Sequence, residues 1–102
     1  MTEPAMANVT VTREQEPKRG RYVGRIAGHA DEAELTFERV NPELIVADHT
    51  LTPVALRGQG IATVLVEHMV ADARREGFKI RPLCPFVVDL FDRRPEWSDL
   101  RA

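Results

Sequence analysis

The sequence lacks several features that whole classes of protein require. It has a single cysteine, Cys84, so no internal disulfide can form. Its three histidines are scattered, with no spacing typical of zinc ligands, so we expect no metal site. No run approaches the roughly 20 apolar residues of a membrane-spanning helix. The first residues show neither the basic nor the apolar segment of a secretory signal. We therefore expect a cytoplasmic protein.

Excess charge of one sign is also missing. The formal net charge is -2, and the 16 acidic and 14 basic residues are interspersed. Such a chain has no broad positive field to hold nucleic acid by its phosphates. Its 102 residues, 43% of them hydrophobic, suffice for one modest core. We expect a flexible terminus over residues 1–8 and a single domain over residues 9–102. That domain should bind neither nucleic acid nor membrane, and should be a monomer or a weak homodimer.

The first half of the sequence has the pattern of β-strands. Alternating or continuous apolar residues predict strands over residues 9–13, 21–27, 34–40 and 43–52. Short turns separate them, so we expect an antiparallel meander, because a parallel crossover needs about a dozen or more residues. The fourth strand contains a nearly continuous apolar run and should lie inside the sheet, buried on both faces.

The second half begins with helical spacing. Apolar residues recur at helical intervals from Ile61, and Gly77 is placed to end this helix. Residues 78–83 predict a short strand in which Pro82 suits a splayed end. Pro85 then suits the first position of a short helix that runs to about Arg94. Together these elements predict an α/β fold of the α+β kind, built on a mixed sheet.

The most informative segment is the turn over residues 57–62, RGQGIA, between the fourth strand and the long helix. Two glycines let the main chain approach a bulky anion, and the first amides and the dipole of the helix attract it. No Ser, Thr, Asp or Asn at residues 56–60 caps those amides. A P-loop and a dinucleotide fingerprint both fit less well, because their closing residues are missing. The turn is therefore either a phosphate site or a purely structural feature.

A family resemblance bears on this choice. Arg57, Gly60 and Ala62 match the Arg/Gln-x-x-Gly-x-Gly/Ala signature of GNAT acetyltransferases. His49 and Thr50 before the turn, and PLCPFV over residues 82–87, resemble a compact single-domain subfamily. The resemblance covers residues 34–100. It implies a minimal acyl-CoA N-acyltransferase fold that lacks the N-terminal helices of larger relatives, with acetyl-CoA as cosubstrate and no metal.

The resemblance also implies which residues hold the coenzyme. The diphosphate of coenzyme A would rest on the amides of the glycine turn, and the pantetheine arm would pair with backbone at the end of the fourth strand. The cofactor-binding residues implied in this way are Leu51, Thr52, Val54, Ala55, Arg57, Gly58, Gln59, Gly60, Ile61 and Ala62.

Two side chains are candidates for the chemistry. His49 would act as the general base, since imidazoles titrate near neutral pH; the alternative is a hydrogen-bonded packing residue. Cys84 precedes Pro85, at the start of the last helix, where unpaired amides favour a thiolate. Cys84 would protonate the leaving sulfur or accept the acetyl group itself, and the alternative is a small buried hydrophobe. The tyrosine that GNAT enzymes usually employ has no obvious counterpart, because the only tyrosine, Tyr22, lies far back in the second strand.

The sequence therefore predicts an N-acetyltransferase that moves the acetyl group of acetyl-CoA to a primary amine. The amine would belong to a protein lysine, a peptide N-terminus or a small molecule. Without the N-terminal helices the acceptor side stays open, and another acceptor or a longer acyl group is an alternative. Two different alternatives are a non-catalytic acyl-CoA-binding module and a small protein-interaction domain.

Overall fold

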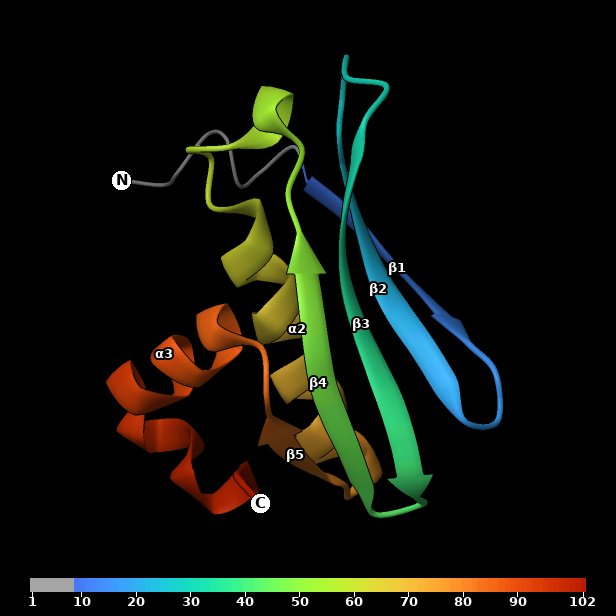
Figure 1. The fold of residues 1–102 in the computed structure, drawn as a ribbon, viewed down its shortest axis with the longest axis vertical. Coiled ribbons are helices and arrows are strands. Elements are labelled where there is room, and N and C mark those ends of the chain that lie inside the picture. The colour runs from blue at the N-terminus through green and yellow to red at the C-terminus, as the bar shows by residue number, and fades with distance from the viewer. Residues whose placement is uncertain (1–8) are drawn as a thin grey trace.

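The computed structural model describes residues 9–102, and the flexible terminus expected over residues 1–8 lies outside them. Five strands form one sheet in the order β1-β2-β3-β4-β5 (Figure 1). The strands are β1 (Val9–Gln15), β2 (Arg19–Ile26), β3 (Glu32–Asn41), β4 (Leu44–Leu51) and β5 (Lys79–Pro82). The helices are α2 (Ile61–Glu76) and α3 (Pro85–Arg93), and the 3-10 helices are η1 (Val54–Leu56) and η2 (Pro95–Leu100).

The sheet is antiparallel except at its last junction. Strands β1 to β4 pair antiparallel with their neighbours in the chain, whereas β4 and β5 pair in parallel. The parallel pair is possible because α2 carries the chain back between them. The predicted meander of four strands followed by a helix and a fifth strand is confirmed.

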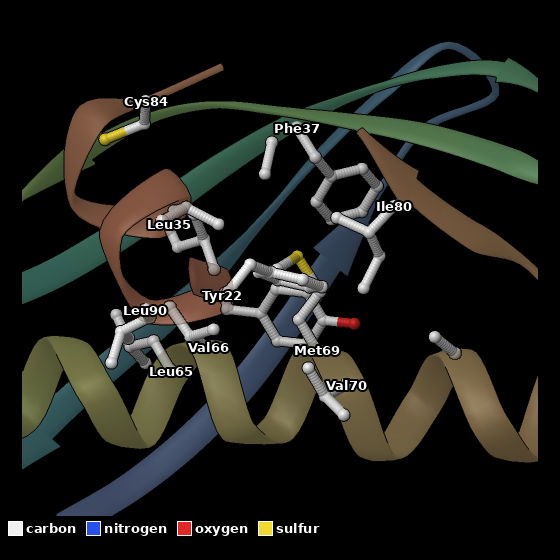
Figure 2. Close-up of a cluster of buried hydrophobic side chains, with 14 of the residues drawn as sticks. Tyr22, Leu35, Phe37, Leu65, Val66, Met69, Val70, Ile80, Cys84 and Leu90 are labelled. Carbon is white, nitrogen blue, oxygen red and sulfur yellow. The ribbon is translucent and has the colours of Figure 1, made fainter. Parts of the chain in front are cut away.

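The helices lie on one face of the sheet. Helix α2 packs against β1, β2 and β3, and η2 packs against both α2 and α3. Buried side chains of α2, α3 and η2 form a single cluster with those of the strands, part of which Figure 2 shows. In the part of the chain that the structure describes, no helix covers the opposite face, which we call the outer face (Figure 1). The largest fully buried side chains of the core are Tyr22, Phe37, Phe78, Leu35, Ile45, Leu56, Ile61, Leu65, Met69 and Ile80.

Helix α2 begins and ends at glycines. Gly60 precedes the first turn and Gly77 follows the last, and both have left-handed backbone conformations. The amides of Gly77 and Phe78 donate to the Ala73 carbonyl at 2.9 and 3.2 Å, which satisfies the end of the helix. The predicted stop at Gly77 is therefore confirmed.

Strand β4 carries a bulge at Asp48. Phe37 of β3 pairs with Ala47, while the preceding residue, Thr36, pairs with His49, so Asp48 is an extra residue in β4. Residues that pair across antiparallel strands point to the same face of the sheet. His49 therefore shares the outer face with Thr36, and Asp48 does so too, since its Oδ1 accepts a hydrogen bond from Thr36 Oγ1 at 2.5 Å. One inserted residue thus reverses the alternation of every side chain beyond it.

Strands β4 and β5 separate after a short run of pairing. Pairing ends at Ala47 and Pro82. The amides of Leu83 and Cys84 then both donate to the Ala47 carbonyl, at 2.9 and 3.1 Å, before the chain turns into α3. Strand β4 continues to Leu51, and within residues 9–102 no strand pairs with its β5-side edge beyond Ala47. The expected splay of the fifth strand from the fourth is confirmed.

Some boundaries differ from the expected ones. The first hairpin is tighter, because β1 continues to Gln15 and the Glu16 amide donates to the Arg19 carbonyl at 2.7 Å. No helix separates β1 from β2, as the minimal fold predicts. The 3-10 helices η1 and η2 were not predicted, since single turns have little periodicity. None of the described helices is both long and apolar enough to cross a membrane.

Candidate active site

The glycine turn is held open by its own backbone. Gly58 and Gly60 have φ angles of 82° and 77°, the left-handed region that glycine adopts without strain. Leu56 is fully buried and anchors the turn to the core. Arg57 Nε donates to the Thr52 carbonyl at 3.1 Å, which ties the turn back to the end of β4. The turn is therefore anchored to the core at Leu56 and to the segment after β4 at Arg57.

The first turn of α2 has no partner from the described part of the chain. No side chain caps it, and it contains no acidic residue. The helix thus presents unpaired amides and the positive end of its dipole. A cavity of about 210 Å³ lies directly against these amides. Its lining residues are Thr52, Leu56, Arg57, Gly58, Gly60, Ile61, Ala62, Thr63 and Phe86.

This cavity connects two segments that are distant in sequence. Phe86 reaches it from the first turn of α3, so the starts of α2 and α3 border the same space. Phe86 lines this space and is exposed, and the other exposed apolar side chains of the neighbouring segments are Leu51, Val54 and Leu83. They lie at the end of β4, in η1, and on either side of Cys84. An anion-binding end and an apolar flank fit a ligand that combines a phosphate with a long uncharged arm.

Cys84 occupies the N-cap position of α3, as predicted. It is 7% exposed, and Figure 2 shows it at one end of the cluster with its sulfur pointing away from the labelled core residues. Its Sγ lies 3.4 Å from Thr50 Oγ1. Burial raises the pKa of the thiol, but the Thr50 hydroxyl and the amides of Val87, Phe86 and Thr50 outweigh it, so the pKa lies below its ordinary value. Although Cys84 stands at the N-cap, its side chain makes no capping hydrogen bond to the helix.

His49 lies on β4, with its side chain on the opposite face of the sheet from that of Thr50. It is exposed on the outer face, where the bulge places it next to Asp48. Thr50, the next residue, pairs with the buried Leu35 and therefore faces the helices. The structure thus brings Thr50, and not His49, into contact with Cys84. His49 flanks the open edge of β4 from the solvent side.

Tyr22 is committed to a different part of the molecule. It is buried, and its hydroxyl donates to Asp72 Oδ2 at 2.7 Å. Burial and this hydrogen bond raise the pKa of Tyr22 above its usual range, so it keeps its proton. In Figure 2 its hydroxyl points away from Cys84. Tyr22 therefore stabilises the contact between β2 and α2 and is not placed to protonate a leaving sulfur at the splayed strands.

The predicted coenzyme residues that precede the glycine turn fall into two groups. Leu51 is the last residue of β4 and Thr52 follows it, whereas Val54 and Ala55 belong to the 3-10 turn η1. Strand-like pairing needs extended backbone, so only the first group can offer it. Among residues 9–102 no group of three or more His, Cys, Asp or Glu side chains could hold a metal ion.

Sequence reasoning gave no role to one residue of this site. The side chain of Thr50 contacts Cys84 across 34 positions of sequence. Simple alternation from Ala47 would place His49 on the helix side and Thr50 on the outer face. Only the bulge exchanges them, and no local sequence signal identifies it.

Known proteins resemble this chain in sequence and in fold. None of the curated proteins is similar enough to match. A solved structure that does match is the NMR solution structure of a protein from Staphylococcus aureus described as a "GCN5-like putative N-acetyltransferase". It is 25% identical, with a TM-score of 0.66, and the match covers 95% of this chain and 91% of that one. This likeness confirms the predicted fold class. A family model described as GCN5-related N-acetyl-transferase matches residues 21–100, and the chain therefore belongs to the GCN5-related N-acetyltransferase family.

Proposed function

We propose that this protein transfers the acetyl group of acetyl-CoA to a primary amine of a protein lysine, a peptide N-terminus or a small molecule. The observation that supports this is the uncapped first turn of α2, which opens into a cavity shared with the start of α3. The amides of residues 58–62 would accept the diphosphate, with Arg57 beside them. Residues 9–102 would act as one catalytic domain, in the cytoplasm.

The open edge of β4 would hold the pantetheine arm. Beyond Ala47 this edge is free of strand partners within the described residues, and it runs from the cavity at Thr52 to the region of Cys84. An amide-containing arm can pair there as an added strand, up to Pro53, which has no amide hydrogen. Val54 and Ala55 would contribute apolar contacts from η1. This path would lead the thioester toward the Cys84 sulfur.

Cys84 would carry the acetyl group during transfer. The thiolate of a cysteine is its nucleophilic form, and the lowered pKa of Cys84 makes that form easier to reach. The thiolate would attack the thioester carbonyl carbon, the bond from that carbon to the coenzyme sulfur would break, and coenzyme A would leave as its thiolate. The amine would then attack acetyl-Cys84, and the Cys84 thiolate would be released as the amide forms. His49 would take the proton that the amine loses.

Intact-mass measurement tests this scheme. The protein is incubated with acetyl-CoA, with and without a lysine peptide. A mass increase of one acetyl group on Cys84 without the peptide, transferred to the peptide when it is added, is the expected result. Label on the peptide alone, with none on Cys84, would indicate direct transfer with Cys84 as the proton donor. Binding of coenzyme A without any transfer would favour a binding module, and absence of binding would favour a protein-interaction domain.

His49→Ala separates the two halves of the reaction. Since His49 would act only on the amine, the variant should still form acetyl-Cys84 but release it to the peptide about 10²–10⁴-fold more slowly. His68→Ala is the matched control, because His68 is exposed on α2 and lines no part of the described cavity. Equal slowing in both variants, or normal transfer by His49→Ala, would remove His49 from the mechanism.

A further inference from the structure

The Thr50 hydroxyl touches the sulfur of Cys84, and the contact has a defined direction. The separation of 3.4 Å lets either atom donate. A thiolate can only accept, however, so the hydroxyl must donate whenever Cys84 is ionised. A hydrogen bond to a charged acceptor is stronger than one between neutral groups. The contact therefore stabilises the ionised cysteine more than the neutral one.

The bulge at Asp48 is what makes this contact possible. It turns the Thr50 side chain to the helix side of the sheet, where α3 begins. Cys84 is held in turn by its own amide, which donates to the Ala47 carbonyl of β4 at 3.1 Å. The cysteine is thus fixed by its backbone to one residue of β4 and by its sulfur to another. Its remaining freedom is rotation of the side chain, and the Thr50 contact restricts that rotation.

We infer that Thr50 is a positioning residue: its hydroxyl donates a hydrogen bond to the Cys84 thiolate and holds the sulfur at the splayed edge of β4. This inference rests on the proposed role of Cys84 in acetyl transfer. Thr50 forms and breaks no covalent bond in this scheme. It acts through Cys84, by favouring the ionised form and fixing its direction of attack.

The charged side chains near Cys84 do not stabilise its thiolate as the Thr50 hydroxyl does. On β4, Asp48 and His49 face the outer side of the sheet. On β5, Arg81 is exposed and pairs in register with Val46, which shares the outer face with Glu38. On α3, Asp89 is exposed and forms an ion pair along its own helix. The groups that lower the pKa of Cys84 are the Thr50 hydroxyl and backbone amides.

Titration of the single thiol tests the inference without any coenzyme. The ultraviolet absorbance of the thiolate gives its titration curve and does not depend on reagent access, and Cys84 is the only cysteine. Thr50→Val removes the hydroxyl at similar volume and should raise the titration midpoint by about one pH unit. Thr50→Ser keeps the hydroxyl and should restore most of the shift. Thr12→Val on β1 makes the same exchange on the outer face and should leave the midpoint unchanged.

The same variants separate this inference from the proposed function. With acetyl-CoA, Thr50→Val should slow formation of acetyl-Cys84 at neutral pH while leaving coenzyme affinity unchanged, and Thr50→Ser should recover the rate. A Thr50→Val midpoint equal to that of the wild type, or an equal shift in Thr12→Val, would overturn the inference. Thr50→Ala provides a second test if the valine variant does not fold. If no acetyl-Cys84 forms in any variant, the proposed role of Cys84 as acetyl carrier fails, and the thiol titration still decides whether Thr50 stabilises the thiolate.

Discussion

Two glycine-to-alanine variants together distinguish a phosphate cradle from a structural turn. One is Gly58→Ala, in the turn before α2, and the other is Gly77→Ala, at the end of that helix. Gly58 and Gly77 have φ angles of 82° and 83°, and an added Cβ would meet no atom within 4 Å at either position. The two substitutions therefore carry the same strain, about 1–2 kcal/mol for a left-handed alanine. Of these two glycines, Gly58 lines the cavity at the start of α2 and Gly77 does not. A methyl group there would occupy space that the diphosphate needs.

Thermal unfolding separates the loss of stability caused by each substitution from any loss of affinity for coenzyme A. Both variants should lose stability to the same extent without ligand, about 4–8 °C in Tm for each kcal/mol. At a coenzyme A concentration about 100 times the wild-type Kd, binding adds about 2.7 kcal/mol of stability. A tenfold loss of affinity in Gly58→Ala would reduce that gain to about 1.4 kcal/mol. Gly77→Ala should keep the whole gain.

The assay is a pair of melting curves for each protein, with and without coenzyme A, supported by titration calorimetry. The reasoning would be refuted if Gly58→Ala kept the wild-type response to coenzyme A. It would also be refuted if Gly77→Ala lost the response equally, since the loss would then arise from general destabilisation of α2. The comparison needs no knowledge of the acceptor.

Three further outcomes are expected. Tyr22→Phe should cost about 1–3 kcal/mol in urea unfolding, because Asp72 loses its hydroxyl partner, yet acetyl transfer should continue; lost transfer at full stability would contradict this. Burial raises the pKa of Asp72, but hydrogen bonds from Tyr22 and Arg75 lower it by more, so the pKa ends below its usual value. Its contribution is present above about pH 4 and is lost as pH falls, so the stability gap between wild type and Asp72→Asn should narrow toward about pH 3. Gly20→Ala would press a methyl group into the Phe37 ring and the Glu14 backbone carbonyl, and should cost about 1–3 kcal/mol in the same unfolding assay; an unchanged stability would contradict this.

The order and type of the main elements were determined by local sequence. Alternating and helical periodicities depend only on neighbours along the chain, and they predicted the meander, α2, β5 and α3. The glycine turn could be predicted equally well, because two closely spaced glycines and the absence of a capping side chain are properties of a few adjacent residues. Pro85 marked the start of α3 and so placed Cys84 at its N-cap.

The contacts of the candidate catalytic side chains, and of Tyr22, were decided by tertiary structure alone. The bulge at Asp48 arises from the register between β3 and β4, and it sends His49 to the outer face and Thr50 toward Cys84. The bond between Tyr22 and Asp72 joins residues 50 positions apart. Periodicity shows which face a residue should occupy only while the alternation is unbroken. The position of a bulge and the identity of a distant contact partner depend on how the strands and helices pack together. That packing cannot be predicted from a short stretch of sequence.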